Sequence, residues 1–270
     1  MAFISFLIIG YLLVPLNNKF GLIQIRASLQ TSVFFLYVSA CPFLHKGQIG
    51  IIIPLLFIGI LFSLFSSYQE KNSGGLLFQS FIYLGIISLL IPQSLFFIPV
   101  LLIAVIMLQS MNAKSLCTSI LGYIMPYWFL FAFAYFTQQM DYFYAPFKEA
   151  FHWYSNVTLL RLPTNLLATI FYFFVLFIIS SIHYTINRHR NKLNIRTFLK
   201  VIIFITATLY LFIFLQPIHI TLLLPCILIG NSILVAHFFA LTKGKWANGF
   251  FIITTIGLFA VFAFNLWTLL

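Results

Sequence analysis

Charged side chains are scarce in this sequence. Of its 270 residues, 6% are charged, whereas 63% belong to hydrophobic types. Soluble domains carry about 25% charged residues, so this chain has too few to cover a soluble surface. The composition therefore excludes a soluble globular enzyme and a disordered chain. It indicates a helical membrane protein, because a helix satisfies its backbone polar groups internally in lipid.

Acidic residues are the rarest of the charged types. They are Glu70, Asp141 and Glu149, and none of them falls within a long apolar run. Proton-coupled transporters usually use an intramembrane acid. Intramembrane aspartyl proteolysis and metal-dependent phosphoalcohol transfer need clustered acids, so the sequence disfavours all three activities. A carboxylate pair for acid–base chemistry is available only from Asp141 and Glu149.

Cysteine and histidine are also too few and too scattered for a metal centre. Cys41, Cys117 and Cys226 lie far apart without CxxC spacing, which disfavours a disulfide or metal framework. His219 and His237 are 18 residues apart on one predicted helix. At 1.5 Å per residue, they are separated by about 27 Å. We therefore expect no metal and no cofactor.

Apolar stretches long enough to cross a bilayer recur along the chain. They predict an all-α, polytopic transmembrane helical bundle of about ten spans. The whole of 1–270 is expected to be a single integral-membrane domain, without a soluble domain. The predicted spans are residues 2–16, 28–44, 49–67, 75–91, 93–110, 116–137, 164–186, 198–216, 218–240 and 247–269. Pro92 and Pro217 mark tight turns between consecutive spans, because proline cannot continue the preceding helical hydrogen-bond pattern.

Basic residues gather on one side of this predicted topology. Eleven of the 14 lie in loops of the same side: Lys19, Arg26, Lys71, Lys114, Arg188, Arg190, Lys192, Arg196, Lys200, Lys243 and Lys245. The other side holds Lys46, Lys148 and Arg161. Cytoplasmic loops are enriched in Lys and Arg. The split predicts a bacterial inner-membrane protein with both termini in the periplasm, and it explains the net charge of +11 without a nucleic-acid partner.

The basic segment 187–200 has two interpretations. It is either a topological anchor or a contact for anionic lipid headgroups. The longest segment outside the spans is 138–163, on the outer side, which is dense in aromatic residues and typical of a stretch at the membrane interface. Its candidate contacts for a ligand or headgroup are Asp141, Glu149, His152 and Arg161. The alternative for the arginine is snorkelling to the interface.

Polar side chains inside the spans are the remaining functional signal. The candidate intramembrane stripe consists of Asn165, Thr169, Tyr172, His183, His219, Asn231 and His237. Hydrogen-bonding residues of this kind commonly hold helices together in lipid. The alternative is a polar crevice between spans 164–186 and 218–240 that admits a headgroup or a solute.

Residues 90–114 and 215–243 share an internal pattern. Each has a proline at the hairpin, a second proline seven or eight positions later, an apolar run and a basic turn. Parallel repeats of this kind occur in transporters. Chance coincidence of prolines is the alternative explanation.

Segments 78–136 and 217–259 carry a family resemblance. The residues concerned are Gly85, Ser88, Leu89 and Pro92, then Gly122, Pro126 and Tyr127, and finally Lys245 and Trp246. In these features the chain resembles an uncharacterised family of multipass inner-membrane proteins from Bacteroidota-type bacteria. The resemblance implies a location and an architecture, and no activity.

These observations favour a non-enzymatic role. We predict a transport, flippase-like or assembly component for envelope lipid or glycan, with membrane lipids as partners. The first alternative is a small membrane enzyme that acts on a lipid-linked substrate at the outer face, through the charged residues of 138–163. The second is a structural subunit of a larger complex, whose polar stripe binds other membrane subunits.

Overall fold

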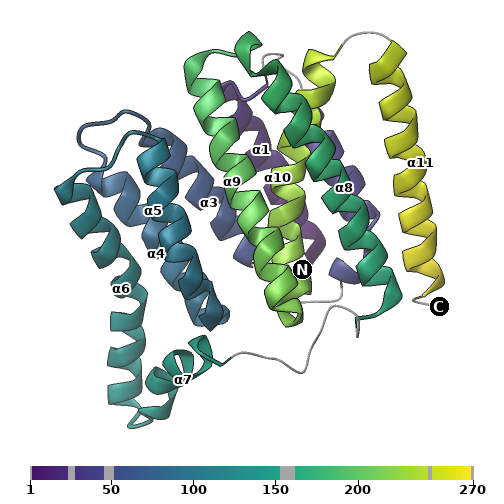
Figure 1. Ribbon diagram of the computed structural model, residues 1–270. Helices are drawn as coiled ribbons and strands as arrows, with labels where there is room; N and C mark the ends of the chain where they lie inside the picture. The colour runs from purple at the N-terminus through teal and green to yellow at the C-terminus, as the bar shows by residue number, and fades with distance from the viewer. Residues whose placement is uncertain (1, 24–27, 46–51, 153–161, 243–244, 269–270) are drawn as a thin grey trace. The chain divides into compact units, whose positions relative to one another are not determined.

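The computed structural model describes residues 2–23, 28–45, 52–152, 162–242 and 245–268 (Figure 1). These residues form α-helices and short 3₁₀ turns, without a strand among them, so the all-α prediction is confirmed. The α-helices are α1 (Ala2–Phe20), α2 (Leu29–Ser39), α3 (Ile52–Ser66), α4 (Gly74–Leu90), α5 (Phe97–Met107), α6 (Ala113–Phe136), α7 (Asp141–Ala150), α8 (Thr164–Asn187), α9 (Leu193–Leu215), α10 (Ile220–Leu241) and α11 (Lys245–Trp267). The 3₁₀ turns are η1 (Pro42–His45), η3 (Pro92–Phe96), η5 (Arg188–Arg190) and η6 (Pro217–His219).

Six of the described helices are long and apolar enough to cross a membrane. They are α1, α6, α8, α9, α11 and the segment of η6 with α10. Shorter apolar helices occupy α2, α3, α4 and the η3–α5 segment. Since a span needs roughly 20 residues, the chain is a multipass membrane protein with six candidate spans by length and composition. The count of ten and the outside position of both termini stay predictions.

Backbone contacts group the chain into two compact units. Unit 1 comprises residues 1–54 and 155–270, and unit 2 comprises residues 55–154. Unit 1 therefore holds α1, α2 and α8–α11, while unit 2 holds most of α3 together with α4–α7. Each unit is described by itself below.

Helix α10 forms the core of unit 1. It packs against α2, α8 and α9, and every residue from Leu223 to Phe238 is buried. A helix that is apolar around its whole circumference belongs in the interior of a bundle. The nearly uninterrupted apolar sequence of α10 therefore accounts for its central place.

Unit 2 is organised around the long contact between α4 and α6. Helix α6 begins with a capping box in which the Asn112 side chain accepts from the Ser115 backbone N–H at 2.7 Å and the Ser115 hydroxyl accepts from the Asn112 N–H at 2.8 Å. This exchange satisfies two N–H groups at the helix start. Helix α7 contacts the end of α6 and turn η3, and Figure 1 shows it lying crosswise there.

The two proline corners have nearly the same backbone geometry. Ile91 ends α4 at φ −128° and ψ 91°, and Gln216 ends α9 at φ −130° and ψ 76°. In each case a proline then opens a 3₁₀ turn that leads into the next helix. The residue before a proline is pushed out of the helical region, which explains both corners. The turns predicted at Pro92 and Pro217 are thus confirmed.

Candidate functional site

Helix α7 carries two different side-chain stripes. Phe143 and Phe147 lie four residues apart and share one face, since an α-helix brings positions i and i+4 together. Tyr142, Pro146 and Glu149 occupy a second stripe. Each stripe borders a separate pocket in unit 2, so both faces of α7 take part in the candidate site.

The first pocket is an aromatic groove with a volume of about 360 Å³. Its lining residues, which define the groove, are Leu95, Tyr123, Ile124, Tyr127, Trp128, Phe131, Phe143 and Phe147. Ring pairs attach α7 to α6: the centroids of Phe131 and Phe143, like those of Tyr127 and Phe147, are 5.3 Å apart. Aromatic pairs of this kind contribute about 0.5–1.5 kcal/mol each beyond area burial.

The tyrosine hydroxyls of the groove are engaged in hydrogen bonds. The Tyr127 hydroxyl lies 2.9 Å from the Ser88 hydroxyl of α4, and the Tyr123 hydroxyl lies 3.4 Å from that of Tyr127. Because these polar groups bind one another and α4, the rings present apolar surface to the groove. The lining residues are otherwise hydrocarbon and indole.

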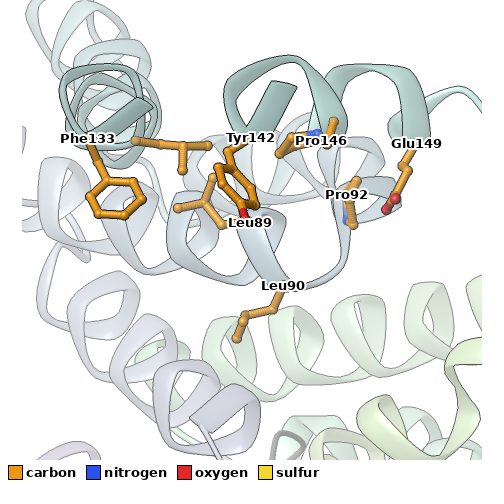
Figure 2. Close-up of a pocket in the computed structure, with 9 residues that line it drawn as sticks. Leu89, Leu90, Pro92, Phe133, Tyr142, Pro146 and Glu149 are labelled. Atoms are coloured by element: carbon orange, nitrogen blue, oxygen red, sulfur yellow. The ribbon is translucent and has the colours of Figure 1, made fainter. Parts of the chain in front are cut away.

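The second pocket is defined here as the carboxylate pocket and has a volume of about 270 Å³. Its lining consists of Leu89, Leu90, Pro92, Leu130, Phe133, Tyr142, Ala145, Pro146 and Glu149. Figure 2 shows Tyr142 and Glu149 extending from α7 toward the side of Leu89 and Pro92. Glu149 carries the only formal charge among these lining residues, so the pocket combines an apolar wall with one anionic group.

Gln93 of turn η3 ties that turn to the end of α7. Its side chain is 1% exposed, and its Nε2 donates to the backbone carbonyl of Glu149 at 3.0 Å. Among the described residues, its Oε1 is buried without a hydrogen-bond partner, as is the hydroxyl oxygen of the neighbouring Ser94. An unpaired buried polar atom costs about 1–3 kcal/mol. The turn beside the carboxylate pocket therefore holds buried polar atoms that no described residue binds.

The structure only partly brings together the candidate contact residues of segment 138–163. Asp141 and Glu149 stand at opposite ends of α7, both exposed, and eight residues of helix separate them by about 12 Å. They do not form a carboxylate pair. His152 is exposed just after α7, and its backbone N–H donates to the Glu149 carbonyl at 3.0 Å. Arg161 lies outside the described residues.

At one end of α8, the predicted stripe links three elements of unit 1. The Thr169 hydroxyl donates to the Asn165 carbonyl at 2.7 Å. Asn265 of α11 donates through Nδ2 to the Thr169 hydroxyl at 3.1 Å and to the Ala40 carbonyl at 2.9 Å. One turn further along α8, the Tyr172 hydroxyl donates to the Thr254 carbonyl of α11 at 2.7 Å.

Asn231 is the central polar residue of α10. It is fully buried, and its Nδ2 donates to the Phe173 carbonyl of α8 at 3.0 Å and to the Tyr210 hydroxyl of α9 at 2.9 Å. This one amide connects three helices. It favours the packing interpretation over a polar crevice between α8 and α10.

The three histidines of the stripe lie apart from that amide. His237 Nε2 is 3.1 Å from Asn191 Nδ2, and His183 Nε2 is 3.1 Å from the Thr242 hydroxyl. His219 is partly buried at turn η6, where its ring stacks on Phe212. Among the described residues, no three His, Cys, Asp or Glu side chains form a group able to hold a metal ion.

Sequence reasoning identifies Glu149, which lines the carboxylate pocket, but misses the other lining residues of both pockets. The sequence marks Phe143 and Phe147 only as members of an aromatic segment, although their i, i+4 spacing is a usable signal. Ser88 and Tyr127 had been noted for the family resemblance, and they prove to be hydrogen-bonded to each other. Gln93 had no distinguishing signal, because its partner Glu149 lies 56 residues away.

Comparisons with models of known protein families, with curated proteins and with solved structures give no match for this chain, so the family resemblance stays a prediction.

Proposed function

We propose that this multipass membrane protein binds an amphiphilic envelope lipid or lipid-linked glycan without transforming it, as a transport, flippase-like or assembly component. We place it in a bacterial inner membrane because of the one-sided distribution of its basic residues. The aromatic groove between α6 and α7 is the observation that carries the proposal. The occupant we assign to it is the hydrocarbon part of the amphiphile.

The chemistry of the groove supports this occupant. Its walls offer rings and alkyl groups, while its tyrosine hydroxyls are bound to one another and to Ser88. A polar ligand would lose its hydration there without gaining hydrogen bonds. A hydrocarbon chain loses nothing of that kind, and the groove volume of about 360 Å³ falls within the range of small-molecule sites.

The separation of the two acids on α7 supports a role without catalysis. General acid–base chemistry requires groups within hydrogen-bond reach of the same substrate atoms. Asp141 and Glu149 are exposed at opposite ends of the helix and do not meet that requirement. The arrangement therefore favours binding over the enzymatic alternative.

The basic segment 187–200 is the second place where we propose lipid contact, with anionic headgroups as the ligand. The Arg196 guanidinium is engaged within the loop, because Nε donates to the Asn191 carbonyl at 2.7 Å and the terminal nitrogen to the His189 carbonyl at 2.8 Å. Arg188, Lys192 and Lys200 are exposed. These exposed cations are the groups that would meet phosphates at the membrane surface.

Photocrosslinking tests the groove directly. A phospholipid with a diazirine in its acyl chain is incorporated into membranes that contain the protein, and crosslinked peptides are mapped by mass spectrometry. We expect labelling of the segments around 123–131 and 143–147, reduced severalfold in Phe147→Ala. Phe151→Ala is the matched control, because Phe151 is 73% exposed and lies outside the groove lining. Equal labelling of those segments in all three proteins would overturn the proposal.

A further inference from the structure

The charged group that lines the carboxylate pocket is a hydrogen-bond acceptor. Glu149 supplies a carboxylate, which in its charged form accepts hydrogen bonds and donates none. Tyr142 adds a phenolic hydroxyl, and the other lining residues are apolar. A ligand that fits here must bring hydrogen-bond donors and positive charge next to an alkyl portion.

The adjoining turn strengthens this acceptor bias. Gln93 uses its amide nitrogen on the Glu149 carbonyl, so the atom left over is the acceptor Oε1, which is buried and has no partner among the described residues. The Ser94 hydroxyl beside it, which can both donate and accept, is likewise buried without a described partner. Neither residue is part of the pocket lining itself. A buried amide that lacks one partner while holding another in place is a feature expected where a ligand or water completes the arrangement.

We infer that the carboxylate pocket is a headgroup subsite for a primary ammonium group, of the kind carried by an ethanolamine phospholipid. This inference rests on the proposed function, because it names the class of amphiphile whose hydrocarbon occupies the aromatic groove. A primary ammonium offers three donors and a positive charge to the Glu149 carboxylate and the Tyr142 hydroxyl oxygen of the lining. An anionic headgroup would be repelled by the carboxylate, and a quaternary ammonium has no N–H to donate.

The two pockets adjoin the same junction of secondary-structure elements. Turn η3 and helices α6 and α7 contribute residues to each of them. On α7, Phe147 of the groove and Glu149 of the carboxylate pocket are two residues apart, which is about 3 Å along the helix axis and about 200° around it, so the pockets lie on opposite faces of α7. A lipid with its headgroup at Glu149 must therefore pass around α7 to place a chain in the aromatic groove.

Native mass spectrometry of the intact protein tests the inference with three lipids that share the same acyl chains and differ only in headgroup: phosphatidylethanolamine, phosphatidylcholine and phosphatidylglycerol. A charge-assisted hydrogen bond implies a preference for the ethanolamine lipid of about tenfold. Glu149→Gln should abolish this preference, and Glu149→Lys should shift it toward phosphatidylglycerol. Asp141→Asn is the matched control, since it neutralises the acid at the other end of α7, which is not among the residues that line the pocket.

The outcomes separate this inference from the proposal beneath it. If the three lipids bind equally and Phe147→Ala weakens the binding of each, the headgroup assignment is overturned, while the assignment of the groove to hydrocarbon is retained. An ethanolamine preference that survives Glu149→Gln with unchanged thermal stability would also overturn it. Absence of bound lipid in every case, together with unaltered crosslinking in Phe147→Ala, would overturn both.

Discussion

Gly122 of α6 lies directly against the backbone carbonyl of Phe78 in α4, and a Cβ atom at this position would overlap that oxygen. The reciprocal contact is at Gly85 of α4, where a Cβ would stand 2.8 Å from the Tyr123 carbonyl oxygen. Both obstacles are backbone atoms, which cannot rotate aside. Small residues allow helices to approach closely in lipid, and this approach fixes the frame that carries α7.

Replacing Gly122 with alanine should therefore destabilise unit 2. Overpacking of a tight contact typically costs about 1–3 kcal/mol, so we expect a lower midpoint of thermal unfolding in detergent. Gly75→Ala in α4 is the control, because a Cβ there meets no atom within 4 Å. That variant should keep or raise the midpoint, since alanine favours a helix over glycine by about 1 kcal/mol. Similar shifts in both variants would contradict the tight contact.

Asn231 should stabilise unit 1 through its two hydrogen bonds. Asn231→Leu removes the donor to Tyr210 and Phe173 while keeping a similar volume. Hydrogen bonds between membrane helices contribute about 0.6 kcal/mol on average and up to about 1.7, so the expected loss is about 1–3 kcal/mol for the pair. A double-mutant cycle with Tyr210→Phe, measured by thermal unfolding, should give less than the sum of the single effects. Strict additivity would contradict the contact.

Asn265 should hold α11 to the rest of unit 1. It is fully buried on a helix whose other side chains are largely exposed, and it bonds both Thr169 and the Ala40 carbonyl. Asn265→Leu should loosen α11, which would appear as faster amide hydrogen exchange along 248–267. Thr255→Val is the control, because the exposed Thr255 hydroxyl bonds only to the Phe251 carbonyl within the same helix. Unchanged exchange in Asn265→Leu would show that the other contacts of α11, including the Tyr172–Thr254 hydrogen bond, are enough to hold the helix.

Much of the helix pattern followed from the sequence, because hydropathy and proline positions act locally. Every predicted span contains a helix, and both proline corners occur where expected. The boundaries were less accurate. Predicted span 28–44 is a shorter helix, Leu29–Ser39, followed by a 3₁₀ turn that opens at Pro42. Predicted span 93–110 becomes turn η3 followed by Phe97–Met107, since the proline corner takes up its first residues.

The candidate site was less predictable than the helices because it depends on tertiary contacts. The pairing of Phe147 with Tyr127 joins residues from α7 and α6, and the Gln93 contact joins residues 56 positions apart. Neither spacing has a periodic signal in the chain. The rare charged residues of 138–163 are conspicuous in the sequence, but it is Phe143 and Phe147 of that segment that line the groove, together with residues of η3 and α6.

Cysteine accessibility tests the predicted orientation of two candidate spans, α6 and α8. Lys114, Lys148 and Lys192 are all exposed, and the candidate spans α6 and α8 lie between them in sequence. In a background with the exposed Cys117 replaced by serine, each lysine is changed to cysteine in turn, while Cys41 and Cys226 are buried.

A membrane-impermeant maleimide added to intact cells should label only Lys148→Cys, because the predicted topology places Lys148 outside and the other two in the cytoplasm. The other two variants should react after permeabilisation. Labelling of Lys114→Cys and Lys192→Cys but not Lys148→Cys would invert the orientation, and labelling of all three in intact cells would show that α6 and α8 do not separate them.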